Sequence, residues 1–229
     1  MLPHRGRSLP AIAASIILPF SAAHGEGVGR PVSHEAAARA KALALYFCAT
    51  KLEKALEYEA ASAAFEQLLA LDPTNTSVSM RAASLSAKLG NRSRGRKIID
   101  SSLAANPGRA EPYFNLARYL DLFQPPGGEA EFSSRALEVA AIAEEKFPLD
   151  SRVCELLVDL HLRVRDPESA ASAVRRFAKR EGPGAQFWLA LGTQALRCFD
   201  LTGGRGDAVR AEIDELFERA LRASAGRPE

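Results

Sequence analysis

The sequence predicts an all-α protein built as a stack of about five helix hairpins. Pro73 and Pro107 each end an amphipathic segment and lie 34 residues apart, and periods of about 20 to 50 residues are typical of helical repeats. Further turn signals follow at Pro148 and, 35 residues later, at Pro183. A chain with this recurrence is expected to bury a continuous seam between neighbouring hairpins instead of one central core.

The first hairpin has the most complete pattern of apolar residues at helical spacing. These residues are Leu45, Cys48, Ala49 and Leu52 on its first helix, and Tyr58, Ala61, Phe65, Leu68 and Leu69 on its second. Pro73 ends the second helix, because proline lacks an N–H donor and disfavours helical geometry at Asp72. No Gly or Pro separates Leu52 from Tyr58, so a single long helix is the alternative interpretation of this segment.

The second and third hairpins keep the register with local deviations. The second turns at Leu89-Gly90-Asn91 and ends at Pro107, but its first helix has only small contact residues and is expected to pack loosely: Ser79, Ala82, Ala83 and Ser86. In the third hairpin, residues 124–128 (Gln-Pro-Pro-Gly-Gly) lengthen the turn and stretch the next spacing to 41 residues, from Pro107 to Pro148. A hairpin loop tolerates such an insertion, since closure entropy grows slowly with loop length.

The fourth and fifth hairpins supply the strongest local signals. Asp166 followed by Pro167 is a good helix start, with Asp as N-cap and Pro in the first turn. The fifth hairpin contains Trp188-x-x-Leu191-Gly192-x-x-Ala195. This segment resembles the tetratricopeptide repeat family, whose pattern is Trp-x-x-Leu-Gly-x-x-Tyr.

The resemblance implies a right-handed α-solenoid over residues 35–225 whose work is protein binding. It places Ala49 and Ala61 where small residues let the two helices of a hairpin approach closely. In this family the first helices of successive repeats line a concave groove. Similar proteins act as adaptors in envelope assembly and secretion, which is what the resemblance implies about the pathway.

Transferred residue by residue, one groove position falls on Lys54, Lys88, Leu122, Arg163 and Arg197. Arg118 faces the same way, and Tyr46 and Phe114 supply aromatic surface. The candidate partner-binding residues are therefore Tyr46, Lys54, Lys88, Phe114, Arg118, Arg163 and Arg197. Such a row of cations favours an acidic or C-terminal-carboxylate segment. The alternative is that these are ordinary exposed helix ends, and the row is diluted by Asp121, Glu155 and Asp159.

The N-terminus has the pattern of a secretory signal peptide. Arg5 and Arg7 precede an apolar stretch at residues 9–20, which is too short and too interrupted by proline to span a membrane. Small residues predict cleavage after Ala23, with the bond after Gly25 as second choice. The protein is therefore expected to be exported, either to the periplasm or to the medium, with a signal peptide at 1–23, a flexible linker at 24–34 and a disordered tail at 226–229.

Charge gives no reason to propose nucleic acid as a partner. The whole chain has 30 Lys and Arg against 28 Asp and Glu, and loss of Arg5 and Arg7 with the signal peptide leaves 28 of each. The three cysteines, an odd number, are interpreted as small buried residues and not as disulfide partners: Cys48, Cys154 and Cys198.

The sequence does not predict an enzyme, a cofactor or a metal site. It contains no H-E-x-x-H, paired C-x-x-C, G-x-S-x-G or P-loop motif. His161 is interpreted as a packing residue, although a pocket that gathered it with carboxylates would favour catalysis. The alternative to a binding scaffold is a structural subunit of a larger assembly, joined through an uncapped C-terminal helix bearing Leu216, Phe217 and Leu221.

Overall fold

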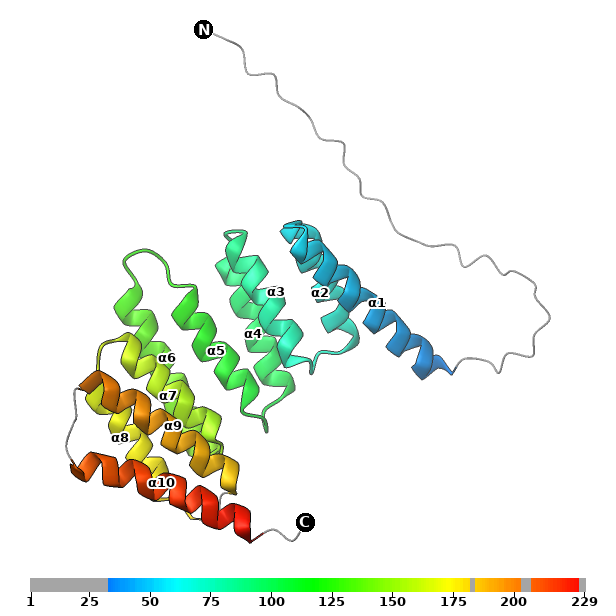
Figure 1. Cartoon of the computed structure of the whole chain (residues 1–229). Helices are drawn as coiled ribbons and strands as arrows, with labels where there is room; N and C mark the ends of the chain where they lie inside the picture. Colours follow the sequence, from blue (N-terminus) through cyan, green and yellow to red (C-terminus); the bar gives the residue numbers. More distant parts are fainter. Residues whose placement is uncertain (1–32, 182–183, 203–206, 227–229) are drawn as a thin grey trace, which may run out of the picture.

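The computed structural model describes residues 33–181, 184–202 and 207–226, and these residues form ten α-helices and no strand. The predicted signal peptide, residues 24–32 of the predicted linker, the turn at 203–206 and residues 227–229 lie outside the described residues. The helices are α1 (His34–Lys54), α2 (Tyr58–Leu71), α3 (Thr76–Lys88), α4 (Arg92–Ala105), α5 (Glu111–Leu122), α6 (Glu129–Lys146), α7 (Ser151–Arg163), α8 (Pro167–Ala178), α9 (Ala185–Thr202) and α10 (Asp207–Ala225) (Figure 1).

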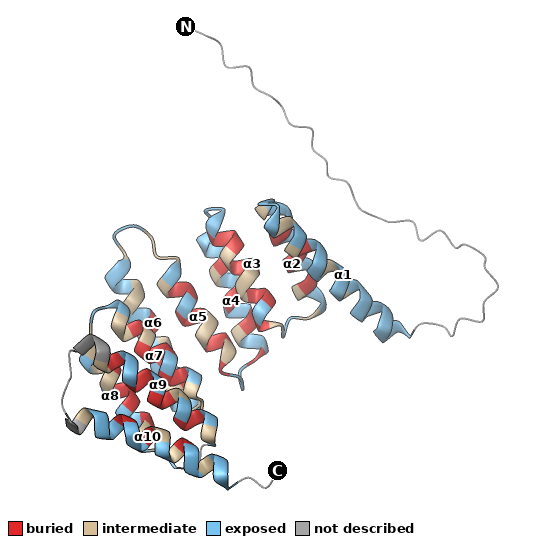
Figure 2. Cartoon of the chain, viewed as in Figure 1, coloured by how far each residue is buried: buried red, intermediate tan, exposed pale blue. Residues whose placement is uncertain are grey.

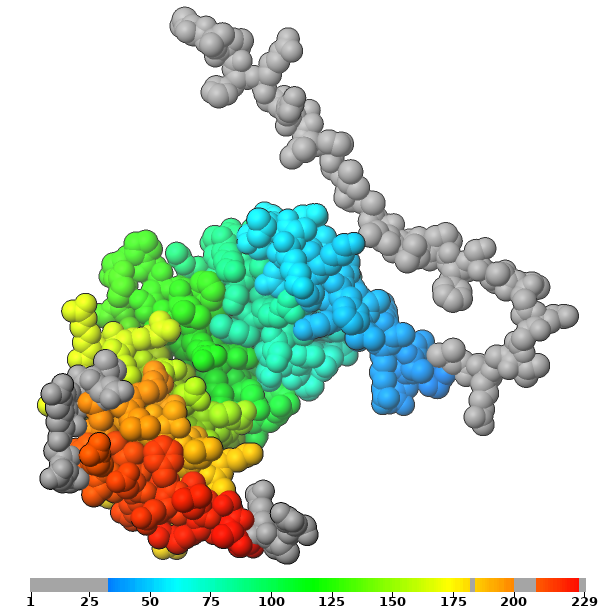
Figure 3. All heavy atoms as spheres, in the orientation of Figure 1, coloured from blue at the N-terminus to red at the C-terminus, as the bar shows by residue number. Residues whose placement is uncertain are grey.

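The helices pair into five hairpins, α1–α2 through α9–α10, that stack in chain order. Each even-numbered helix also packs against the odd-numbered helix that follows it. We call the odd-numbered helices the first helices and the even-numbered ones the second helices. Neighbouring first helices touch one another, as α3–α5, α5–α7 and α7–α9 do, and the stack follows a curved path from α1 to α10 (Figure 3). The predicted all-α solenoid of helix hairpins is therefore confirmed.

The first hairpin contains a turn that has no glycine or proline. α1 ends at Lys54, and Leu56 adopts a left-handed conformation with φ 63°. The backbone N–H of Glu57 then donates to the carbonyl of Leu52 at 2.9 Å. The same turn in the second hairpin uses Gly90, with φ 84°. The single long helix is thus the wrong alternative, because a leucine accepts a conformation that costs an L-residue about 1–2 kcal/mol.

Close approach of the two helices in each hairpin depends on small residues. Buried small residues recur at one register position in the first helices and at another in the second helices: Ala49, Ala83, Ala117 and Gly192, and Ala61, Gly95, Ala136 and Ala170. A Cβ atom on Gly95 would lie 2.6 Å from the carbonyl oxygen of Ala83 and 2.3 Å from the hydroxyl of Tyr119. The predicted contact role of Ala49 and Ala61 agrees with their complete burial. Figure 2 shows that buried residues occur along the whole stack of helices.

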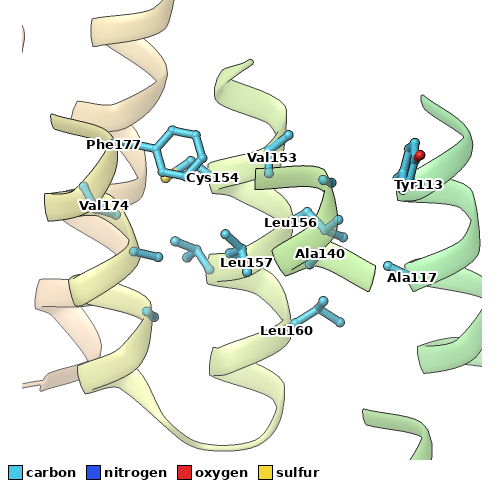
Figure 4. Packing of buried hydrophobic residues seen from close by; sticks show 14 of the residues in the cluster. Tyr113, Ala117, Ala140, Val153, Cys154, Leu156, Leu157, Leu160, Val174 and Phe177 are labelled. Atoms are coloured by element: carbon cyan, nitrogen blue, oxygen red, sulfur yellow. The ribbon is translucent and has the colours of Figure 1, made fainter. Parts of the chain in front are cut away.

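Larger side chains fill the space between the hairpins. Phe65, Leu85 and Ile99 are fully buried toward the N-terminal end, and Phe177 and Leu191 toward the C-terminal end. Figure 4 shows how α7 supplies the middle of this core: its apolar side chains lie between α5 on one side and α8 on the other. Because every hairpin shares its apolar surface with its neighbours, the core is a continuous seam.

The second hairpin packs tightly, so the expectation of loose packing was wrong. Ser79 and Ser86 of α3 are buried. The hydroxyl of Ser79 donates to the carbonyl of Thr76 at 2.8 Å and lies 2.9 Å from the hydroxyl of Ser102. The hydroxyl of Ser86 lies 3.4 Å from that of Ser62 on α2. Small side chains bring these helices close together, and the buried hydroxyl groups contact one another, so they do not remain unpaired.

Helix starts follow the capping signals in the sequence. Asp166 caps α8 by accepting from the backbone N–H of Ser169 at 3.0 Å, as predicted. Ser33 caps α1 in the same way, accepting from Ala36 at 3.2 Å, so α1 begins at the last residue of the predicted linker. The inserted residues 124–128 lie in the turn between α5 and α6.

Two of the three cysteines behave as predicted. Cys154 and Cys198 are buried and free, but Cys48 is exposed, because it lies on a part of α1 that no other described hairpin covers. Burial raises the pKa of the Cys154 thiol to about 12, which keeps it a neutral packing group. Within the described ranges, none of the helices has the length and apolar character needed to cross a bilayer.

Replacing Gly95 with alanine tests the close approach of α3 and α4. We expect Gly95→Ala to lower the free energy of unfolding by about 1–3 kcal/mol. The added methyl group would push the Tyr119 side chain and the backbone of α3 away from α4. Thermal unfolding followed by circular dichroism measures this loss. Gly108→Ala is the matched control, since a Cβ there meets nothing within 4 Å. Equal midpoints for the two variants would contradict the proposed steric constraint.

Candidate functional site

The first helices bring the predicted cationic row to one register position on the inner layer. Lys54, Lys88, Leu122 and Arg163 are the last residues of α1, α3, α5 and α7. Arg197 lies at the same register position inside the longer helix α9. Helices that stack with a constant repeat place equivalent residues side by side, so the sequence register predicts the correct order along this wall.

Two residues of the row are paired within the protein. Nη1 of Arg163 lies 3.1 Å from Oδ2 of Asp121 on α5. Nη2 of Arg197 lies 2.8 Å from Oδ1 of Asp159 on α7, and its Nη1 donates to Oε1 of Gln194 at 2.7 Å. Each of these arginines therefore connects its own first helix to the preceding one.

The Asp121 carboxylate explains why Arg163 is needed there. The side chain of Asp121 is only 8% exposed. Burial raises its pKa above the ordinary value, the nearby charge of Arg163 opposes that rise, and Asp159 adds to it. A carboxylate held at this depth needs a cation beside it, so we assign Arg163 a structural role.

A second structural cation, Arg81, lies between α3 and α1. Its guanidinium carbon lies 4.5 Å from the ring centre of Phe65 and 5.4 Å from that of Tyr46. Its Nε donates to Oε2 of Glu53 at 3.1 Å and its Nη1 to the hydroxyl of Thr50 at 3.2 Å. Tyr46 thus presents one part of its ring to solvent and packs the other part against Arg81. The pairing was missed in the sequence analysis, because residues 53 and 81 meet only once the hairpins stack.

Three of the predicted cations have no carboxylate partner among the described residues. They are Lys54 on α1, Lys88 on α3 and Arg118 on α5, and all three are exposed. Nζ of Lys88 lies 5.6 Å from the ring centre of Tyr58. Because this ring is neutral, the positive charge of Lys88 has no counter-charge there. The N-terminal three hairpins therefore carry the cationic part of the inner wall, while the charges of Arg163 and Arg197 are compensated internally.

A recess of about 180 Å³ lies between α5 and α7. Its lining residues are Phe114, Arg118, Arg152, Glu155, Leu156 and Asp159. The structure thus brings Phe114 and Arg118 together, as predicted. It adds Arg152, whose guanidinium carbon lies 5.3 Å from the Phe114 ring centre and whose Nη1 donates to Glu111 at 2.9 Å. The register could have found this pair, since positions 111 and 152 are 41 residues apart, the spacing of the lengthened repeat.

Two further recesses lie between second helices, on the other layer. One of about 290 Å³ separates α8 from α10 and has Cys198 and Leu216 in its lining, with Arg175 and Glu212 paired at 3.1 Å beside them. The other, of about 370 Å³, lies between α2 and α4. From α3 to α9 the neighbouring first helices also contact one another directly. In a curved stack the layer whose helices lie closer together is the inner one, so we assign the inner side to the first helices.

His161 lies on α7 with its Nδ1 buried and without a hydrogen-bond partner. The closest carboxylate is Asp166, whose Oδ2 is 3.9 Å from that nitrogen. Burial lowers the pKa of His161, and Asp166 partly opposes this effect. A single carboxylate at that distance does not form the acid–base set that catalysis would need. The part of the chain that the structure describes also has no group of three or more His, Cys, Asp or Glu residues placed to hold a metal ion.

Comparison with known protein families gives one match. Residues 54–118 match the family model described as tetratricopeptide repeat. This stretch runs from the end of α1 into α5 and includes the whole second hairpin. No curated protein matches the sequence.

Several solved structures are similar to the chain. A thermophilic TPR protein from Thermus thermophilus is 14% identical with a TM-score of 0.45, over 77% of this chain and 99% of that one. A MamA structure from Desulfovibrio magneticus RS-1 is 15% identical with a TM-score of 0.42, over 82% and 98%. A mutant O-GlcNAc transferase from Thermobaculum terrenum is 23% identical with a TM-score of 0.42, over 62% of this chain and 26% of that one.

Removing Arg163 tests its structural role. We expect Arg163→Ala to lower the free energy of unfolding by about 1–3 kcal/mol, because the buried carboxylate of Asp121 loses its partner. The pKa of Asp121 in the folded variant then rises further above the unfolded value, so the folded state binds more protons as the pH falls. The deficit relative to the wild type should therefore shrink toward acidic pH. Urea unfolding at several pH values measures both effects.

Two controls accompany this variant. Asp121→Asn placed on top of Arg163→Ala should recover most of the lost stability, since no charge then remains to be neutralised. Arg118→Ala, an exposed cation without a carboxylate partner, should change stability by no more than about 0.5 kcal/mol. If Arg118→Ala and Arg163→Ala had the same effect, the Asp121 pairing would not be a structural contact.

Proposed function

We propose that this chain is an exported scaffold that binds a segment of another protein along the inner wall of its solenoid. The helical-hairpin fold and the tetratricopeptide match of residues 54–118 support protein binding as the general function. One observation carries the finer proposal: Lys54, Lys88 and Arg118 are exposed, lack carboxylate partners among the described residues and share the inner layer.

The chemistry of this wall favours an acidic partner segment with apolar residues. Lysine and arginine side chains hold carboxylates by charge-assisted hydrogen bonds, and the rings of Tyr46 and Phe114 offer contact surface between the cations. Arg163 and Arg197 are not anchors in this proposal, because Asp121 and Asp159 already occupy their guanidinium groups. The proposed binding surface is therefore the inner wall of the first three hairpins.

Export is the second part of the proposal, and the N-terminal sequence supports it. The basic residues Arg5 and Arg7, the apolar stretch at 9–20 and the small residues at 21–23 have the order of a signal peptide. A protein-binding solenoid released by cleavage after Ala23 would work in the periplasm or outside the cell.

The alternative function, a structural subunit joined through its C-terminal helix, needs a change in the residues involved. Leu216 is buried within the fifth hairpin and Phe217 is half-buried, so neither is free for an outside contact. Leu221 alone of the three is exposed, at 68%. A contact through α10 by itself is thus less favoured than binding along the inner wall.

Reversing charge on the inner wall tests the binding proposal. We expect the wild type to select peptides rich in Asp and Glu from a random displayed library. Lys88→Glu combined with Arg118→Glu should weaken binding of the best acidic peptide by about 10- to 100-fold, the loss of one or two charge-assisted bonds. Fluorescence anisotropy with that peptide measures the change.

Lys97→Glu is the matched control, because Lys97 is an equally exposed cation on α4, a second helix of the same hairpin as Lys88. It should leave the affinity unchanged. Selection of peptides without acidic enrichment, or an equal loss in the Lys97→Glu control, would count against an acid-binding inner wall.

The export proposal predicts the N-terminus of the mature protein. When the chain is expressed in its native host, the exported fraction should begin at His24, or at Glu26 if the second bond is cut. Intact-mass spectrometry of fractionated cells checks this. Protein that retains Met1 and remains only in the cytoplasmic fraction would contradict export.

A further inference from the structure

The two ends of the solenoid expose apolar side chains at register positions that the interior covers. Phe47 on α1 is 63% exposed. Its equivalents in the next three hairpins are Arg81, Asn115 and Leu156, which follow at spacings of 34, 34 and 41 residues. Leu156 at the same register position is only 5% exposed, and Arg81 and Asn115 are half-buried, so stacking covers this position wholly or in part.

Two equivalents of Phe47 make polar contacts toward the preceding hairpin, and the third, Leu156, lines the recess between α7 and α5. Arg81 bonds to Thr50 and Glu53 of α1. Asn115 donates to the carbonyl of Thr76 on α3 at 2.8 Å. Phe47 faces the position where a preceding hairpin would lie, and the described part of the chain supplies none. Leu43, one turn away on the same helix face, is exposed as well.

These residues form a stripe along α1. Ala36, Ala40, Leu43 and Phe47 lie at spacings of four, three and four residues, which places them on one face of a helix. The opposite face carries Ala49 and the other residues that pack against α2. We call Ala36, Ala40, Leu43 and Phe47 the leading edge.

The other end has a complementary surface. On α9, Leu196 is 44% exposed, and Leu189, two turns earlier on the same helix face, is exposed too. The equivalents of Leu196 in the first and third hairpins are Glu53 and Asp121, which pair with the following first helix through Arg81 and Arg163. Leu196 therefore faces the position where a sixth first helix would lie. We call Leu189, Leu196 and the exposed Leu221 of α10 the trailing edge.

We propose that the leading edge of one copy of this chain docks on the trailing edge of a second copy. The contact would continue the stacking that already joins the five hairpins, with α1 of one copy in the place of a sixth first helix. Apolar side chains of both edges would leave water together, which is the same driving force that closes the interior seam.

Charge selects this head-to-tail arrangement over the symmetric ones. α1 carries four Lys and Arg against two Asp and Glu, whereas α10 carries three Arg against five Asp and Glu. Two leading edges would bring together net positive helices, and two trailing edges would bring together net negative ones. Only the leading-to-trailing contact pairs opposite charges, and complementary potentials favour the matched partner.

The contact is heterologous, so it adds copies in series and leaves one free edge at each end. Each edge offers only a few large apolar side chains, which places the interface among small, concentration-dependent ones. Since both helices carry exposed charges, rising salt should weaken the association.

Sedimentation velocity of the full-length chain tests the proposal with one variant for each edge. The wild type should show a weight-average mass that rises with concentration. Phe47→Glu, which blocks the leading edge, and Leu196→Lys, which blocks the trailing edge, should each remain monomeric at concentrations where the wild type associates. An equimolar mixture of the two variants should form dimers and nothing larger, because only one intact leading edge and one intact trailing edge remain to pair.

Ile142→Glu is the control, since Ile142 is a similarly exposed apolar residue on α6, away from both edges. It should associate like the wild type, and circular dichroism confirms that each variant is folded. A wild type that is monomeric at all concentrations would overturn the proposal. So would association of the Leu196→Lys variant by itself, which would indicate symmetric pairing through the leading edge.

Discussion

The close approach of two helices within each hairpin is the constraint on which the other features depend. It depends on small side chains at one register position of most helices, although α7 has Val158 there. Gly95, where a methyl group would meet the backbone of Ala83, shows how little space remains. Small residues bury little apolar area, so most of the hydrophobic stabilisation comes from larger side chains such as Phe65 and Phe177 that fill the space between hairpins. The small residues set the geometry, and the large residues supply the free energy.

That geometry fixes which charged residues can meet. Once the first helices stack side by side, the pairs Glu53–Arg81, Asp121–Arg163 and Asp159–Arg197 connect successive hairpins along the inner layer. The carboxylate of Asp121 is buried and needs its partner, whereas the two partly exposed pairs contribute little to stability. All three pairs determine which cations remain available. The proposed binding surface consists of the inner-layer cations that have no carboxylate partner among the described residues, and these lie in the first three hairpins.

The sequence predicted the fold because the information that specifies it is local and repeated: prolines at a constant spacing, small residues in register and a Trp-x-x-Leu-Gly motif at residues 188–192. The same repeat places Lys54, Lys88, Leu122 and Arg163 at the ends of the first helices. The sequence did not predict which members of the cationic row are paired, since Arg163 and Asp121 are 42 residues apart and meet only in the stack. The turn at Leu56 was ambiguous, because its left-handed residue is not a glycine. Cys48 is exposed because the described residues include no hairpin before α1, and repeat periodicity alone does not show this.

A solenoid differs from a globular protein in one further way: the kind of surface that joins neighbouring hairpins inside the stack is also present on the two terminal hairpins. Every hairpin presents one side to the preceding neighbour and one to the following neighbour. Within the described residues, the first and last hairpins therefore each have one side that no other hairpin covers. Phe47 and Leu196 stand at the register positions where Leu156 and Asp121 are covered. The inner wall and the leading edge adjoin at Tyr46 and Phe47, whose rings are in contact. Lys88 and Arg118 lie on α3 and α5, so head-to-tail contact through α1, α9 and α10 would leave them exposed in every copy. Serial association would then multiply the number of binding walls, and linked sites hold a multivalent partner more tightly than any one of them does alone.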